Sequence, residues 1–117
     1  MLKSHEDLFA WKMSYELTKS IYKLTKTFPK DERYCFVDQM RRAALSIPSN
    51  ISEGYYRYSK NEYRHFCYIA YGSANELHTQ IKLARDLNFS SAENFLETEN
   101  LLIQTLKLLN ALCRSLH

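Results

Sequence analysis

A proline lies within a helical pattern in the stretch Ser46-Ile47-Pro48-Ser49-Asn50-Ile51-Ser52-Glu53-Gly54-Tyr55-Tyr56-Arg57. Apolar residues around it recur in steps of three and four, which places them on one helix face; they are Val37, Met40, Ala44, Ile47 and Ile51. A proline inside a helix removes one backbone hydrogen bond and crowds the carbonyl group four residues earlier, here that of Ala44, at a cost of about 3 kcal/mol. We therefore predict one long helix, kinked at Pro48, with a polar opposite face.

The composition favours a chain made only of helices. The 117 residues include two glycines and two prolines, which leaves little material for tight turns, while helix-forming residues dominate. This length fits one domain, residues 1–117, with a modest core. No apolar run approaches the roughly 18 residues that span a bilayer, and the N-terminus lacks the apolar segment of a secretory signal. We therefore expect an all-α cytoplasmic protein with no membrane contact.

Four amphipathic segments follow one another with short joints. We expect helices over residues 6–27, 31–57, 60–88 and 91–116. Ser4 is the predicted N-cap of the first helix, and Ser59 with Glu62 forms a predicted capping box at the third. The apolar series assigned to the first helix is Leu8, Trp11, Tyr15, Ile21, Leu24 and Phe28. Since short connections place successive helices antiparallel, the sequence predicts an up-down-up-down four-helix bundle.

Positive charge is concentrated in the first half of the chain. Residues 1–64 carry 12 Lys or Arg against 8 Asp or Glu, whereas residues 65–117 carry 4 against 5. The richest cluster of cations and aromatic rings is the segment 55–64, at the joint between the second and third helices, with Arg41 and Arg42 further back. Arginine and lysine neutralise phosphates and tyrosine stacks on unpaired bases, so this patch indicates a nucleic-acid partner. The alternative is that the tyrosines belong to the core and the cations form a solubilising rim.

Two helix faces carry residues that a bundle core does not explain. They include, on the second and third helices, Ser46, Ser49, Glu53, Tyr68, Gly72 and Asn75. Tyrosine and small residues suit a packed interface better than a surface of lysine and glutamate does, so we predict contacts between subunits there. The alternative is a solvated face. Glu53 is also spaced for an ion pair with Arg57, four residues later.

No catalytic, metal or cofactor site emerges from the sequence. Two glycines leave almost no room for a phosphate-cradling loop, and the three cysteines have no Cys-x-x-Cys spacing. Glu62 and His65 have the Glu-x-x-His spacing of di-iron bundles, but those sites need a second such motif, which is missing. We therefore expect a non-enzyme that holds neither a metal nor a cofactor.

A series of motifs runs through about the first 90 residues. It comprises Glu6-Asp7-Leu8 with Trp11, Ile21-Tyr22-Lys23-Leu24-Thr25, Phe28-Pro29, Glu32-Arg33-Tyr34, Gln39-Met40-Arg41-Arg42-Ala43, Ser46 to Gly54, Ser59-Lys60 with Glu62, Phe66, Ile69-Ala70, Gly72-Ser73, Glu76-Leu77 and Leu83-Ala84. In these motifs the chain resembles the bacterial four-helix-bundle proteins encoded by intervening sequences in 23S ribosomal RNA genes. That family, whose biochemical role is not settled, also includes the accessory variability protein of diversity-generating retroelements.

The resemblance implies a non-enzymatic homo-oligomer, a ring-like pentamer. The retroelement branch uses a basic surface of its ring to bind nucleic acid and the reverse transcriptase. The basic residues at matching positions in this chain are Arg41, Arg42, Arg57, Lys60 and Arg64. The resemblance thus implies binding of RNA, DNA or a ribonucleoprotein through neutralised phosphates. The alternative is a protein-interaction scaffold that docks a protein partner on the second and third helices and binds no nucleic acid.

Overall fold

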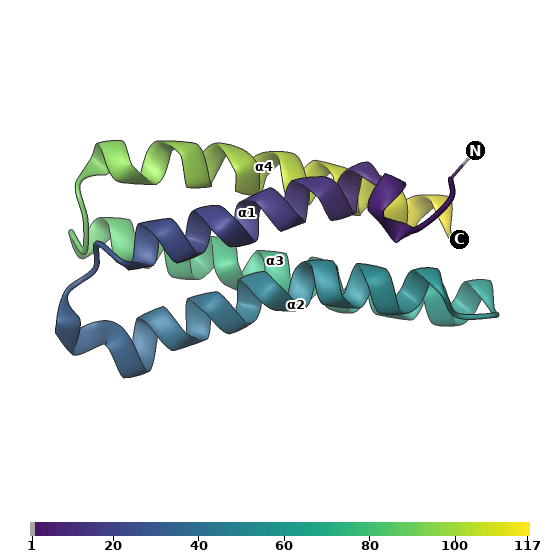
Figure 1. The fold of residues 1–117 in the computed structure, drawn as a ribbon, viewed down its shortest axis with the longest axis horizontal. Helices are drawn as coiled ribbons and strands as arrows, with labels where there is room; N and C mark the ends of the chain where they lie inside the picture. The colour runs from purple at the N-terminus through teal and green to yellow at the C-terminus, as the bar shows by residue number, and fades with distance from the viewer. Residues whose placement is uncertain (1) are drawn as a thin grey trace.

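Four antiparallel helices pack side by side in the computed structural model, which describes residues 2–117 (Figure 1). They are α1 (Phe9–Thr25), α2 (Asp38–Tyr55), α3 (Lys60–Asp86) and α4 (Ala92–Ser115). α1 packs against α2 and α4, and α3 packs against the same two helices. Residues 2–117 contain no strand. The predicted all-α, up-down-up-down four-helix bundle is confirmed, and both chain ends lie at the end of the bundle where α2 joins α3.

The segment before α2 differs most from the predicted helix bounds. A helix was expected from residue 31, but Lys30–Glu32 form a 3-10 turn and Arg33–Val37 a turn of π-helix. Phe36 packs edge-on against Phe89, with 5.1 Å between ring centroids, while Val37 is buried. Two consecutive apolar side chains therefore both reach the interior, which the wider π turn permits and which α-helical spacing could not indicate.

Serine side chains begin two of the helical segments, as expected. Ser4 Oγ accepts the N–H of Glu6 (3.2 Å), although the element that it caps is a 3-10 turn that precedes α1. The Asp7 carboxylate accepts the backbone N–H groups of Lys3 and Ser4, and these hydrogen bonds lower the pKa of Asp7. At α3, Ser59 Oγ accepts the N–H of Glu62 (3.0 Å). Both caps satisfy backbone donors that have no partner inside the helix.

The bundle core is a continuous apolar seam shared by all four helices. Its largest fully buried apolar side chains are Leu17, Ile21, Met40, Ile47, Ile51, Leu77, Ile81, Phe95, Leu102 and Leu109. Trp11, from the apolar series of the first helix, is partly buried and packs against this seam, whereas Tyr15, from the same series, is 46% exposed. None of the helices between residues 2 and 117 combines the length and hydropathy needed to cross a bilayer.

The helix α2 continues through Pro48, which is buried. Proline has no N–H, so the carbonyl group of Ala44 lacks its usual helical donor. A side chain from α1 supplies the missing donor: Thr18 Oγ1 lies 3.1 Å from the Ala44 oxygen and 2.8 Å from the Ser14 oxygen. The single proton of the Thr18 hydroxyl is shared between these two oxygens, so Thr18 offers a donor to the acceptor that Pro48 leaves open and joins α1 to α2 at this level. The kink at Pro48 stays a prediction.

Candidate functional site

The cations at the joint between α2 and α3 are held by contacts within the chain. Lys60 Nζ donates to the carbonyl oxygen of His117 (2.9 Å), and Arg64 Nη1 donates to that of Leu116 (3.1 Å). Arg57 forms the predicted ion pair with Glu53, and its guanidinium lies 4.8 Å from the centroid of the Phe66 ring. Lys60 and Arg64 therefore satisfy carbonyl groups at the negative end of α4. The patch that the sequence indicated as a nucleic-acid site also closes this end of the bundle.

The other two predicted nucleic-acid residues lie near the opposite end of α2. Arg41 Nε donates to Thr25 Oγ1 (2.9 Å), and its guanidinium lies 4.5 Å from the centroid of the Tyr22 ring. Arg42 is exposed. With a rise of about 1.5 Å per residue, Arg41 is roughly 21 Å along the axis from Tyr55, the last residue of α2. A single chain therefore does not bring the five predicted cations into one patch.

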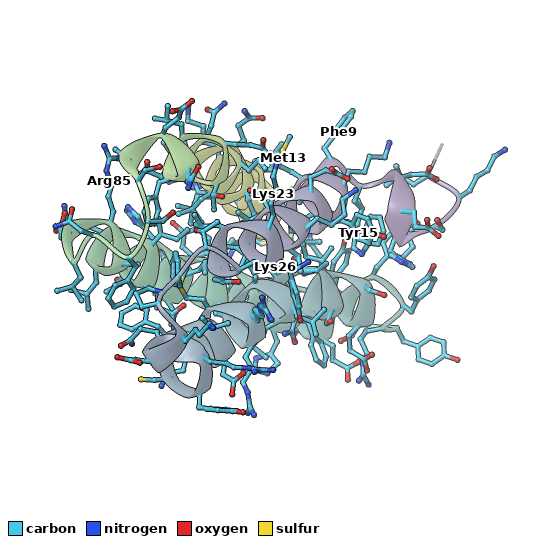
Figure 2. All side chains as sticks on the ribbon, turned by 60° about the vertical axis from the view of Figure 1, so that its left-hand side comes forward. Phe9, Met13, Tyr15, Lys23, Lys26 and Arg85 are labelled. Carbon is cyan, nitrogen blue, oxygen red and sulfur yellow. The ribbon has the colours of Figure 1, made fainter. Side chains whose placement is uncertain are left out.

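A groove of about 470 Å³ runs between α1 and α2. We call it the α1–α2 groove; its lining residues are Tyr15, Thr18, Lys19, Tyr22, Lys23, Lys26, Leu45 and Pro48. Its floor is apolar and open to solvent, because the Tyr15, Tyr22 and Leu45 side chains are 46%, 39% and 51% exposed. Figure 2 shows Tyr15 and Lys26 on the side of α1 next to α2, whereas Phe9 projects from the opposite side.

The rim of the α1–α2 groove is positively charged. Lys19 and Lys23 on α1 and Lys26, the residue that caps the end of this helix, follow one another at i, i+4 and i+7 and are exposed. Lys19 pairs with Glu16 (3.1 Å), but among residues 2–117 neither Lys23 nor Lys26 forms an ion pair. Arg41 adds a fourth cation where it lies over Tyr22. The groove thus combines an apolar floor with four cations, of which one is paired with a carboxylate.

Two tyrosines of this groove have rings fixed by neighbours. The Tyr15 ring stacks on Trp11, with 5.0 Å between centroids and 24° between planes, and Lys19 Nζ lies 5.4 Å from its centroid. The Tyr22 ring lies under the Arg41 guanidinium. Helical spacing places Tyr15 in an apolar series, and the sequence alone predicts no binding role for Lys19, Lys23 or Lys26. The signal that could identify the groove from the sequence is the spacing of these lysines at i, i+4 and i+7, next to two tyrosines, Tyr15 and Tyr22, that are seven residues apart.

The predicted interface residues do not all face outward. Ser46 is half-buried between α2 and α3, where its Oγ lies 2.9 Å from Ser73 Oγ, so its expected outward orientation is wrong. The small serine side chains let α2 and α3 come close together, and the hydrogen bond between the two hydroxyl groups gives each of these half-buried polar groups a partner. Ser49 and Glu53 are exposed, as predicted.

The predicted interface residues of α3 are exposed. Tyr68 is 44% exposed, and its hydroxyl lies 2.7 Å from His117 Nε2. Asn75 donates to the carbonyl oxygen of Tyr71. Gly72 is open enough that an added Cβ would have no atom within 4 Å. The face of α3 that carries Tyr68, Gly72 and Asn75 is therefore accessible to another chain.

The cysteine and acidic side chains form no evident chemical centre. Burial raises the pKa of Cys67 to about 12 and also raises the pKa of Cys113, so both remain thiols at neutral pH. Cys35 is exposed. The Glu62 carboxylate accepts the Ser59 hydroxyl (3.3 Å). Over residues 2–117, no three His, Cys, Asp or Glu side chains gather as a metal site would require.

Comparison with known proteins places this fold in a family. A family model described as 23S rRNA-intervening sequence protein matches residues 6–111. Among solved structures, the chain is similar to a protein of unknown function from the S23 ribosomal protein family of Bacteroides thetaiotaomicron. The two chains are 23% identical with a TM-score of 0.81, and the match covers 89% of this chain and 97% of that one. A search of curated proteins gave no match.

Proposed function

The chain belongs to the 23S rRNA-intervening sequence protein family, and we propose that it is a non-enzymatic, homo-oligomeric bundle that binds nucleic acid. The observation that carries this proposal is the α1–α2 groove, which Lys19, Lys23 and Lys26 line and beside which Arg41 lies over the Tyr22 ring. When such side chains neutralise the phosphates of a nucleic acid, they displace the counterions that were bound there. The release of these counterions makes binding favourable and strongly dependent on salt. Phosphate contacts carry little sequence information, so base specificity should be low.

Assembly of several copies of the chain would strengthen the binding of nucleic acid by these cations. We infer a ring-like pentamer and a relation to the accessory variability protein, in line with the family motifs around Pro48. In a ring, the modest cationic surface of each protomer would be repeated, and the fields of the copies would add. The exposed α3 face around Gly72 supports such a contact between subunits. The partner is then a nucleic acid or a ribonucleoprotein long enough to reach several copies.

Neutralising the lysine rim is expected to weaken nucleic-acid binding. The triple variant Lys19→Gln, Lys23→Gln, Lys26→Gln should reduce the slope of log affinity against log salt by about 2–3, because each phosphate contact contributes about 0.7–0.9. Fluorescence anisotropy with labelled RNA and DNA over a salt series measures this slope. Glutamine keeps a high helix propensity, so the fold should persist.

A matched variant controls for the general loss of positive charge. Lys82, Lys107 and Arg114 are exposed cations on α3 and α4, away from the α1–α2 groove. Changing all three to glutamine removes the same charge and should leave most of the affinity intact. Equal losses in the two triple variants would show that binding follows net charge and that the groove has no special part in it.

Replacing Gly72 by arginine is expected to lower the mass of the assembly. The open surroundings of Gly72 let a single chain accept the side chain, and arginine is a better helix former than glycine. A long cation at a packed subunit contact would, however, keep the subunits apart. Light scattering on the variant, with Gly72→Ala as the control, measures the mass. An unchanged mass would place the subunit contact elsewhere, and a monomeric wild type would contradict the homo-oligomer itself.

The exposed apolar side chains favour a second candidate function, a protein-interaction scaffold. Leu45 and Tyr68 are 51% and 44% exposed, and buried aromatic and apolar anchors dominate protein interfaces. Under this alternative the wild type would bind neither RNA nor DNA at low salt. The substitution Tyr68→Ala would then disrupt a protein complex that the lysine variants leave intact.

A further inference from the structure

We propose that the α1–α2 groove takes a single strand, whose unpaired bases stack on Tyr15 and Tyr22 while its phosphates meet the lysine rim. This inference rests on the proposed nucleic-acid function and names the class of nucleic acid. It follows from three features of the groove: its tyrosine rings are held in place, its floor is apolar, and its row of lysines runs beside the row of tyrosine rings.

The two tyrosine rings are positioned before any ligand arrives. Trp11 stacks on Tyr15, and the Arg41 guanidinium lies over Tyr22 at 4.5 Å, yet both tyrosines keep a large exposed surface. Rings held in this way lose little conformational freedom on binding, which favours affinity. No side chain or backbone group forms a hydrogen bond with either hydroxyl among residues 2–117. The two rings are therefore held by their aromatic and cation–π contacts, without a hydrogen bond through either hydroxyl group.

The apolar floor distinguishes a single strand from a duplex. A duplex keeps its bases stacked inside and presents phosphates, so it would reach the lysines and leave Leu45 and the tyrosine rings in water. A single strand offers the flat apolar faces of its bases, which stack on aromatic side chains whatever their sequence. The groove volume of about 470 Å³ lies within the roughly 300–1,000 Å³ of typical ligand sites, so it has room for planar rings.

The cations follow the same course as the rings. Tyr15 and Tyr22 are seven residues apart on α1, and Lys19 is seven residues before Lys26, the C-cap residue of α1, which corresponds to about 10.5 Å in each case. A row of charges therefore runs beside a row of aromatic surfaces over an equal length. This is the arrangement that single-strand-binding proteins use, a charged groove that follows the backbone and rings that hold the bases.

The test measures how tightly the 117-residue protein binds two probes. The first is a fluorescent oligouridine longer than the roughly 4–16 nucleotides that single-strand sites cover, and the second is an RNA duplex of equal length. We expect the wild type to bind the single strand at least about fivefold more tightly, the effect of one stacked base or more. The double variant Tyr15→Leu, Tyr22→Leu should lose this preference, while its affinity for the duplex stays unchanged.

A conservative variant and a fold control complete the test. The variant Tyr15→Phe, Tyr22→Phe keeps both rings and should bind the single strand as the wild type does. Circular dichroism verifies that all variants remain helical. Equal affinity of the wild type for both probes would overturn the single-strand assignment while leaving the backbone-binding function standing. Binding of neither probe at low salt would overturn both proposals and favour a protein partner in the groove.

Discussion

Replacing Gly54 by alanine is expected to lower the free energy of unfolding by about 1–3 kcal/mol, the usual cost of inserting a methyl group into a filled core. Gly54 is buried in the last turn of α2, where an added Cβ would lie 2.8 Å from Phe66 Cβ and 3.2 Å from the Tyr63 carbonyl oxygen. Both atoms are fixed close to the α3 backbone, so α2 and α3 would have to move apart. Urea denaturation followed by circular dichroism measures the change.

The second glycine provides the matched control. Gly72 is in α3 with no atom within 4 Å of an added Cβ, so Gly72→Ala should stabilise the protein by about 0.5–1 kcal/mol through reduced backbone entropy alone. The two Gly→Ala changes should therefore shift stability in opposite directions. Shifts of the same sign would show that the close approach of α2 and α3 at Gly54 is not a constraint.

The fold follows from apolar spacing because four amphipathic helices with short joints have few ways to bury their seams. Spacing indicates which face of a helix is apolar, but it cannot indicate how near two helices come. The contact of Gly54 with Phe66 and the pairing of Ser46 with Ser73 depend on that distance. The π turn before α2 is set by where Phe36 meets Phe89, a residue of the joint before α4.

The candidate site was harder to predict for a related reason. The cations of segment 55–64 adjoin one another in sequence and resemble a binding patch, but Lys60 and Arg64 contact the end of α4, more than fifty residues away. The α1–α2 groove needs two helices to form, and neither helix alone indicates it. Tyr15 keeps helical spacing with core residues, so only its exposure in the bundle separates it from them.

Replacing Thr18 by valine is expected to destabilise the protein by about 1–3 kcal/mol, the cost of leaving a buried acceptor without a donor. Valine keeps the shape of threonine but removes the hydroxyl that lies 3.1 Å from the Ala44 oxygen. That oxygen has no helical donor of its own because residue 48 is proline. The loss should therefore depend on the proline, which a second substitution can test.

The change Pro48→Ala restores an N–H group four residues after Ala44, so the Ala44 oxygen would regain a donor within α2. In that background Thr18→Val should cost less than in the wild type, by about 1 kcal/mol, the net value of one hydrogen bond. Urea denaturation of the wild type, both single variants and the double variant measures this coupling. An equal cost of Thr18→Val in both backgrounds would mean that Thr18 acts through Ser14 or through packing. A coupling of the expected sign would show that a residue of α1 makes a helix-breaking residue tolerable in the middle of α2.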